Sequence, residues 1–248
     1  HMDRYLSYHD YKNIKFLVLK YALFNISYDD TDGRLSNPLN YKDMDIPQVV
    51  LELPTFKDWP MHDIENLRAS LAVLKCYYEN FDNSSFDELN LAKTLERAFM
   101  NFRKPPHRFE IIENSIGINF INDSKATNLD AMLKAIQAVN ELKKDQESIS
   151  LICGGDLKEQ DTNLTSLTSV SSVSRVLIYG KDKEILFESM RKYTECLLVN
   201  DLEEAVMEAK KLSKEGDYVM LSPACSSLDM FINYQERGDK FKRLIEDL

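Results

Sequence analysis

From about residue 105 to its end, the chain alternates short apolar runs with longer amphipathic segments. The apolar runs are typical of buried strands, and one of them, Val176-Leu177-Ile178-Tyr179, ends at a glycine. In the amphipathic segments the apolar residues recur three and four positions apart, which predicts helices. The expected strands are 108–113, 116–121, 148–153, 174–179, 195–199 and 217–221, and the expected helices are 129–143, 182–192, 201–214 and 230–246. This alternation predicts an α/β domain with a mostly parallel sheet covered by helices.

The residues before this region follow a different pattern. Leucines three and four positions apart predict one helix, and a second apolar face further along predicts another. The expected elements are helices at 11–23, 63–78 and 86–99, a strand at 48–53 and a loop rich in Asp, Asn and Tyr at 27–47. Pro105 and Pro106 then break the pattern. We therefore expect two domains, residues 1–104 and 105–248.

Composition narrows the class of protein. The 248 residues carry a formal net charge of −10, from 31 basic and 41 acidic side chains, which argues against nucleic acid as a partner. The sequence has no run of about 18 apolar residues, so we expect no membrane span. The 4 cysteines form no Cys-x-x-Cys pair. Buried thiols in a reducing cytoplasm are therefore favoured over a disulfide framework or a metal site.

Three of the expected strands end in residues that can bind an anion. Asn-Asp-Ser-Lys-Ala-Thr-Asn follows the first at 122–128, and it places Lys125 beside Asp123 and free helix N–H groups. Lys158 follows the two glycines that end the second, and Ser222 to Leu228 follow the third. Because carboxyl ends of parallel strands meet at one edge of a sheet, these junctions predict a shared ligand site. The alternative is three ordinary turns.

Two further groups of polar residues lie near the domain boundary and in the first domain. Arg108, after His107, can form a salt bridge or reach a nucleotide, because its planar guanidinium suits phosphate or ribose. Asp63 and Asn66 lie one turn apart at the start of the helix expected at 63–78, behind His62. A capped helix with a solvated first turn is the alternative interpretation of that group.

The motif at 122–128 and the run Ser-Pro-Ala-Cys-Ser-Ser at 222–227 together resemble the Mur ligases, and most closely the D-glutamate-adding, MurD-type branch. The resemblance is strong over 105–248 and patchy over 3–104. It implies a Rossmann-like C-terminal domain that binds the amino acid, preceded by the C-terminal part of a central ATPase domain. The printed residues contain no Gly-x-x-x-x-Gly-Lys-[Ser/Thr] loop, so we expect them to be a piece of a longer protein.

The resemblance also implies roles for individual residues. It assigns Asn66, His107, Arg108 and Asp123 to nucleotide binding, Lys15 and Lys125 to catalysis, and Thr127, Lys158, Ser227, Leu228 and Tyr234 to D-glutamate binding. Lys15 corresponds to a lysine that becomes carbamylated and then holds Mg²⁺ through oxygen. A solvated helix lysine is the alternative for this position. Asp63 stands where the family has asparagine, and Tyr234 where it has phenylalanine.

The function implied is an ATP-dependent amide-bond ligase that uses Mg²⁺ and adds D-glutamate to UDP-N-acetylmuramoyl-L-alanine through an acyl phosphate. This reaction belongs to peptidoglycan precursor synthesis, and the resemblance implies a cytoplasmic monomer. Two alternatives remain open. One is another Mur ligase or a folylpolyglutamate-type ligase, and the other is a diverged binding or regulatory module without catalysis. A phosphate-binding loop encoded upstream in the gene would favour a ligase.

We predict that these 248 residues by themselves have no ligase activity, because the β- and γ-phosphates of ATP need the backbone N–H groups and lysine of such a loop. ADP release is measured with UDP-N-acetylmuramoyl-L-alanine, D-glutamate and Mg-ATP. Turnover above a protein-free control would contradict the prediction.

Overall fold

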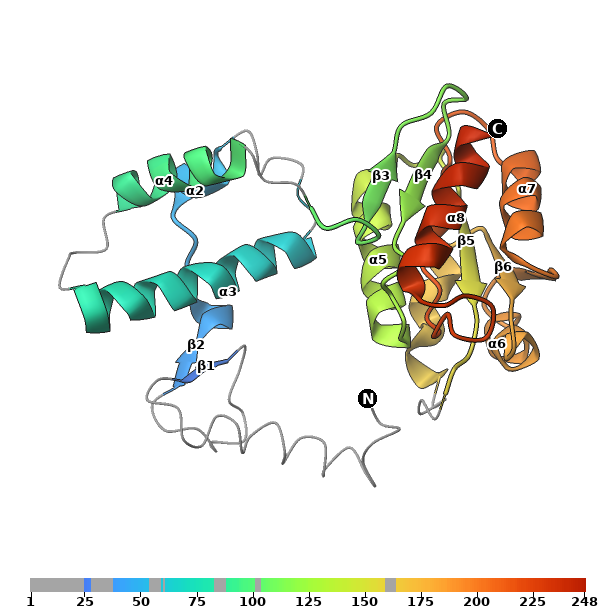
Figure 1. Cartoon of the computed structure of the whole chain (residues 1–248), viewed down its shortest axis with the longest axis horizontal. Helices are drawn as coiled ribbons and strands as arrows, with labels where there is room; N and C mark the ends of the chain where they lie inside the picture. The colour runs from blue at the N-terminus through green and yellow to red at the C-terminus, as the bar shows by residue number, and fades with distance from the viewer. Residues whose placement is uncertain are drawn as a thin grey trace. The chain divides into compact units, whose positions relative to one another are not determined.

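A computed structural model describes residues 25–27, 38–53, 59, 61–82, 88–100, 104–158 and 164–248. The chain divides into two compact units, residues 1–103 and residues 104–248, here named unit 1 and unit 2 (Figure 1). The helix expected at 11–23, with Lys15, lies outside the described residues.

Unit 1 contains helices that pack through their leucines. Its elements are β1 (Asn25–Ser27), β2 (Pro38–Asn40), η2 (Tyr41–Asp43), α2 (Gln48–Leu51), α3 (Met61–Tyr77), the π-helix η4 (Tyr78–Asp82) and α4 (Glu88–Met100). Leu67 and Leu71 of α3 meet Leu91 and Leu95 of α4 in one buried cluster. The periodicity that predicts helices at 63–78 and 86–99 is thus the packing face of α3 and α4.

The strand expected at 48–53 is wrong, because the structure has a helix there. Pro47 precedes the first turn of α2, and of the apolar run only Val50 is buried, whereas Val49 and Leu51 are exposed. A short apolar run has no periodicity by which a strand can be distinguished from a helical turn. The expected loop at 27–47 also contains regular structure, since β2 pairs in parallel with β1 and η2 follows it.

Unit 2 is built on a sheet whose described strands are in the order β3-β4-β8-β5-β6-β7. The strands are β3 (Glu110–Ile112), β4 (Asn119–Asn122), β5 (Ile149–Gly154), β6 (Arg175–Tyr179), β7 (Glu195–Leu198) and β8 (Tyr218–Leu221). Only β3 runs antiparallel to its neighbour in this sheet. The expectation of a mostly parallel α/β sheet is confirmed.

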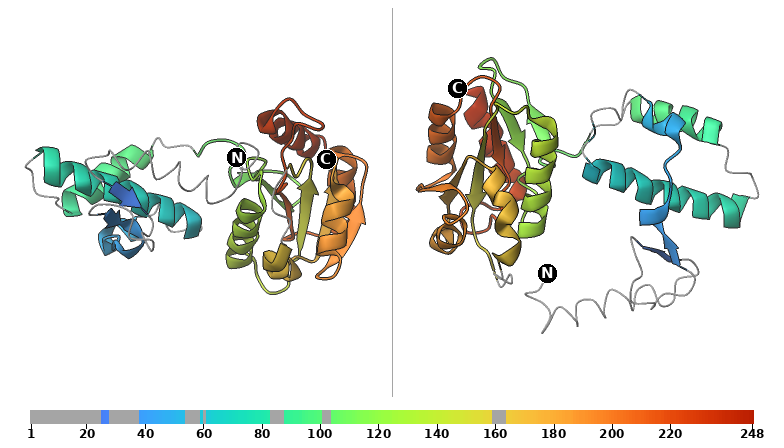
Figure 2. Two further views of the ribbon diagram at one scale, coloured as in Figure 1. Left: turned by 90° about the horizontal axis from the view of Figure 1, so that it is seen from below. Right: turned by 180° about the vertical axis from the view of Figure 1, so that it is seen from behind.

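Helices cover both faces of this sheet, as Figures 1 and 2 show. They are α5 (Leu129–Leu142), the 3-10 helix η5 (Leu164–Ser172), α6 (Lys183–Met190), α7 (Leu202–Leu212) and α8 (Tyr234–Glu246). Alternate strand residues point to opposite faces. Leu151 and Val176 therefore join the core beneath α5, η5 and α6, whereas Ile152 and Leu177 join the core beneath α7 and α8.

The largest departures from the sequence expectation in unit 2 are an additional helix and a later helix start. The helix η5 is not among the expected elements; its apolar residues Leu164, Leu167 and Val170 recur every three positions, which is the period of a 3-10 helix. Helix α8 begins at Tyr234 rather than at 230, since Asn233 caps it by accepting a hydrogen bond from Glu236 N at 2.8 Å. The residues between β8 and α8 consequently form a loop at the edge of the sheet.

The strand order brings the three anion-binding candidates to one place. β8 lies between β4 and β5, and Leu221 is in register with both Asn122 and Ile152. The loops that leave the carboxyl ends of β4, β5 and β8 are therefore neighbours, although their sequences are far apart. None of the helices within the described ranges is long and apolar enough to span a bilayer.

We predict that residues 105–248 fold without unit 1, because both apolar clusters of unit 2 are complete within it. Denaturant unfolding of the isolated segment, followed by circular dichroism, should show one cooperative transition. The same transition measured in the whole chain is the control. A broad, non-cooperative loss of signal from the segment would contradict the prediction.

Candidate active site

Asp123 joins the loops that follow β4 and β8. One oxygen of its carboxylate accepts a hydrogen bond from Ser222 Oγ at 3.0 Å, and the other accepts one from Phe109 N at 3.2 Å. Its backbone N–H donates to Leu221 O at 2.8 Å. The carboxylate thus fixes the start of the 122–128 loop, and part of its hydrogen-bonding capacity is used within the protein.

Arg237 on α8 holds the same two loops together from the interior. Its side chain is fully buried, with 0% of the residue exposed. Nε donates to Ser124 Oγ at 3.0 Å, one terminal nitrogen donates to Ser124 O at 2.8 Å, and both terminal nitrogens donate to Cys225 O at 3.2 Å. Burial lowers the pKa of this guanidinium. A buried cation tolerates this desolvation only when its hydrogen bonds are made, so Arg237 fixes the spacing of the loops.

His107 is buried in the interior of unit 2 and contacts the 122–128 loop. Its ring nitrogen Nδ1 is 3.0 Å from Asn122 Nδ2, and its carbonyl accepts a hydrogen bond from Lys125 N at 3.0 Å. The backbone of His107 is left-handed, with φ 64°. Gly238 of α8 packs on the ring so closely that a Cβ atom there would stand 2.2 Å from Nδ1. The ring of His107 is therefore held in place by packing and serves the structure of the loop.

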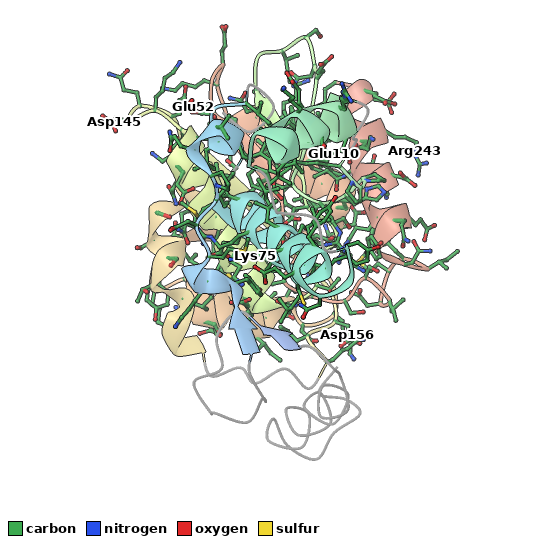
Figure 3. The ribbon with its side chains drawn as sticks, turned by 90° about the vertical axis from the view of Figure 1, so that its left-hand side faces the viewer. Glu52, Lys75, Glu110, Asp145, Asp156 and Arg243 are labelled. Carbon is green, nitrogen blue, oxygen red and sulfur yellow. The ribbon has the colours of Figure 1, made fainter. Side chains whose placement is uncertain are left out.

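Glu110, labelled in Figure 3, lies on β3. It accepts hydrogen bonds from His107 N at 3.0 Å and from Lys242 Nζ at 2.6 Å. Burial opposes the negative charge, but these two donors outweigh it and lower the pKa of Glu110. Strand β3 is thereby tied to α8 and to the loop.

Lys125 and Tyr234, which come from opposite ends of unit 2, meet at the edge of the sheet. Lys125 Nζ lies 4.0 Å from the centre of the Tyr234 ring, a cation–π contact. Ser124 Oγ donates to Tyr234 O at 2.8 Å, which fixes the first turn of α8 against the loop. The Tyr234 ring also packs edge-on against His107, with centroids 6.2 Å apart. The structure thus brings Lys125 and Tyr234 together.

Ser227 and Leu228 occupy the loop between β8 and α8. Ser227 is buried, and its carbonyl accepts hydrogen bonds from Met230 N at 3.2 Å and Phe231 N at 2.8 Å. The side chain of Leu228 is exposed, and its backbone N–H donates a hydrogen bond to Ser226 Oγ at 3.5 Å. In the same loop, burial raises the pKa of the Cys225 thiol to about 12, which makes a nucleophilic thiolate unfavourable.

The turn after β5 carries Lys158 at its end. Asp156 and Ser226 exchange backbone hydrogen bonds of 3.0 and 2.9 Å, which joins this turn to the β8–α8 loop. Lys158 is exposed and left-handed, with φ 55°. Gly155 lies so close to Ser226 O that a Cβ atom there would be 2.2 Å from it, which requires glycine. The turn after β5 and the loop after β8 are therefore bonded directly to each other.

For the remaining site residues predicted from the sequence, the structure gives the unit and the exposure of the side chain. Arg108 is exposed near the start of unit 2, and Thr127 is half-buried before α5. Asn66 is exposed and Asp63 half-buried at the start of α3 in unit 1. Within the described parts of the chain, no group of three or more His, Cys, Asp or Glu residues could hold a metal ion.

Several residues that organise the site have little signal in the sequence. They are Glu110, Lys181, Asp182, Asp229 and Arg237. Gly238 carries a weak signal, since a glycine within a helical pattern often marks close packing. From the sequence alone, Arg237 would be interpreted as a solvated helix residue, because it lies among charged residues such as Glu236 and Asp239, which are exposed. Its burial follows only from the position of α8 on the sheet.

Unit 2 is thus a Rossmann-like domain whose loops converge at the carboxyl edge of its central parallel strands, the usual ligand position in open α/β sheets. Residues 107–225 match the family model described as Mur ligase, glutamate ligase domain. Unit 2 thus carries, over these residues, the glutamate ligase domain of the Mur ligases.

Relatives with a named activity extend the match to unit 1. The UDP-N-acetylmuramoylalanine–D-glutamate ligase of Francisella philomiragia is 30% identical over 256 aligned residues, covering 100% of this chain and 58% of that protein. The enzyme of the same name from Aquifex aeolicus is 40% identical over 153 residues, 61% of this chain and 35% of that protein. The chain therefore spans little more than half the length of relatives that it matches throughout.

Solved structures of related ligases share the fold. The UDP-N-acetylmuramate–alanine ligase MurC of Thermotoga maritima matches with a TM-score of 0.50 at 15% identity, over 76% of this chain and 39% of that one. Escherichia coli FolC, solved with DHPP and ADP, matches with a TM-score of 0.50 at 18% identity, over 74% of this chain and 39% of that one. At these identities the likeness concerns the fold.

We predict that Gly238→Ala destabilises unit 2, although alanine is the better helix former. The new methyl group would overlap the buried His107 ring, and overpacking of this kind costs about 1–3 kcal/mol. Urea unfolding should show the loss. Arg243→Ala, on the exposed side of α8, is the control and should change stability by less than about 0.5 kcal/mol. Equal stabilities of Gly238→Ala and the wild type would contradict the packing role.

Proposed function

We propose that this chain is the D-glutamate-adding part of a UDP-N-acetylmuramoylalanine–D-glutamate ligase, an enzyme of peptidoglycan precursor synthesis. The observation that carries the proposal is the meeting of three loops at the carboxyl edge of β4, β8 and β5. The similarity of the whole chain to ligases of that name supports it. By the same analogy, we propose a cytoplasmic monomer.

The amino-acid pocket in this proposal consists of residues from all three loops. Lys158 binds a carboxylate of D-glutamate through its ammonium group, and the Thr127 and Ser227 hydroxyls bind the remaining polar groups. Leu228 contributes backbone groups. Tyr234 closes the pocket, and its contact with Lys125 supports this position, since the ring lies over the loop that carries Thr127. Lys125 adds a positive charge beside the pocket.

Nucleotide binding is proposed for Arg108, Asp123 and Asn66. The exposed guanidinium of Arg108 can form bidentate contacts with phosphate or ribose. The carboxylate of Asp123 accepts hydrogen bonds from Ser222 and Phe109, which hold it at the sheet edge where the nucleotide would bind. His107 belongs to this group through its backbone and its neighbour Arg108, because its ring is buried.

ATP, when bound, supplies the phosphoryl group that activates the acyl carboxylate of the acceptor. Mg²⁺ would be held by Lys15, if that lysine carries a carbamate, through hard oxygen ligands. The described residues fit a role in orienting the amino acid. They fix the carboxylate and thereby direct the amine of D-glutamate, a placement that can account for much of the rate of amide-bond formation.

The first alternative function is that of a ligase with the same fold and another substrate. The fold alone does not distinguish such a ligase from a D-glutamate-adding one. A diverged module without catalysis is the second alternative. Lys158 distinguishes among these readings, because a lysine that binds the D-glutamate carboxylate affects that substrate and not ATP.

In the full-length protein, Lys158→Ala should raise the KM for D-glutamate by roughly 10–150-fold, the effect of losing a charge-assisted contact of about 1.5–3 kcal/mol. The KM for ATP should change little. Steady-state ADP release, measured at varied D-glutamate and separately at varied ATP, gives both constants.

Lys134→Ala is the matched control. This lysine lies on the exposed side of α5 in a surface ion pair with Asp130, at 3.1 Å, and should leave both constants unchanged. If Lys158→Ala leaves the KM for D-glutamate at the wild-type value, or raises only that for ATP, the pocket assignment is wrong.

A further inference from the structure

We propose that Asp156, Lys181 and Asp182 are positioning residues for Lys158: they hold its turn in the left-handed conformation that presents the ammonium group to the ligand carboxylate. The inference rests on the proposed role of Lys158 and assigns the residues that set its geometry. None of the three needs to contact the ligand.

The turn needs such support because its backbone is unfavourable. Lys158 has φ 55°, a conformation in which side chains with a Cβ atom are strained. Strain of this kind persists only where the surroundings impose the conformation, and it is concentrated at functional sites. Two carboxylates bind the backbone of this turn, those of Asp182 and Asp156.

Asp182 is the first of these groups. It occupies the N-cap position of α6, yet its side chain makes no capping hydrogen bond to its own helix. Asn128, Asp201 and Asn233 at the corresponding positions of α5, α7 and α8 all cap their helices. The carboxylate of Asp182 instead accepts a hydrogen bond from Leu157 N at 2.7 Å. Asp182 therefore does not stabilise α6 as an N-cap would. Its carboxylate fixes the backbone of Leu157, the residue before Lys158.

Asp156 is the second group, and it holds Lys158 itself (Asp156 is labelled in Figure 3). One carboxylate oxygen accepts a hydrogen bond from Lys158 N at 2.7 Å. The other accepts one from Lys181 Nζ at 3.1 Å. The backbone bond from Lys158, followed by the bond from Lys181, lowers the pKa of Asp156, so the carboxylate stays charged at neutral pH.

Lys181 balances the charge of Asp156. An anion so close to Lys158 would otherwise attract its ammonium group and compete with a ligand carboxylate. The backbone of Lys181 is itself fixed, since its N–H donates to Asp229 Oδ2 at 3.0 Å. Lys181 thus supplies a cation to Asp156 from the loop after β6. Lys158 is left available for the ligand.

The first test does not depend on any ligand. In the 248-residue chain, Asp182→Ala should speed hydrogen exchange of the Leu157 amide, read by NMR, by about tenfold or more, because a charged acceptor is lost. Asp182→Asn keeps an acceptor oxygen and should stay within about threefold of the wild type. Circular dichroism verifies that both variants are folded.

Asp201→Ala is the matched control for this measurement. It removes a carboxylate that caps α7 through Glu204 N at 3.0 Å, and it should leave the Leu157 amide unchanged. Unchanged exchange of that amide in Asp182→Ala would overturn the role of Asp182.

The second test measures D-glutamate kinetics in the full-length protein. Lys181→Met should raise the KM for D-glutamate by about 3–5-fold, the upper part of the range for exposed ion pairs, with kcat and the KM for ATP within about twofold. Asp156→Asn/Lys181→Met should return the KM to within about twofold of the wild type, since the competing charge is then absent. Lys211→Met, which breaks a surface ion pair of 3.3 Å with Glu208, is the control.

The outcomes separate this inference from the proposed function. If the double variant remains as impaired as Lys181→Met, Lys181 acts on the ligand directly and the balancing role is wrong. A normal KM in Lys181→Met together with a raised KM in Lys158→Ala overturns the inference and leaves the pocket intact. A normal KM in Lys158→Ala rejects the pocket, while the amide exchange still decides whether Asp182 holds the turn.

Discussion

The buried guanidinium of Arg237 is the constraint on which the candidate site depends. It is removed from water between two loops whose carbonyl groups, Ser124 O and Cys225 O, have no partner within a strand. Neither the cation nor the carbonyls could be buried alone without a large desolvation cost, so each makes the burial of the other possible. Because the loops follow β4 and β8, this cluster fixes the edge at which Lys125, Tyr234 and Ser227 lie.

The strand order extends this constraint to the third loop. β8 pairs with β4 on one side and β5 on the other, and Asp156 pairs with Ser226 just beyond the strands. Close backbone approach is then unavoidable, and glycine occupies positions where a Cβ atom would collide, among them Gly154, Gly155 and Gly238. Positive φ angles at His107, Phe109 and Lys158 lie around the same edge. Strain and close packing together are typical of a site whose geometry is held for a ligand.

The Mur ligase domain and the proposed activity rest on different observations. The domain follows from the match over residues 107–225, and the α/β fold agrees with it. The proposed activity concerns a longer protein, since the chain spans 58% of the length of the Francisella ligase. Because the proposed amino-acid pocket lies in unit 2, Lys158 is the most informative residue for experiments.

The sequence by itself determined the parts of this protein that depend on local pattern. Apolar runs and helical periodicity predict the strands and helices of unit 2, and two short motifs mark the ends of β4 and β8, because strand and helix periods are properties of neighbouring residues. The run at 48–53 is the instructive failure, since a few consecutive apolar residues fit either element and packing decided for α2. The tertiary structure alone decided that β8 lies between β4 and β5, that Arg237 is buried, and that Asp182 serves Leu157 rather than its own helix. These contacts join residues 25 or more positions apart, and only the free energy of packing and of satisfying buried polar groups selects them.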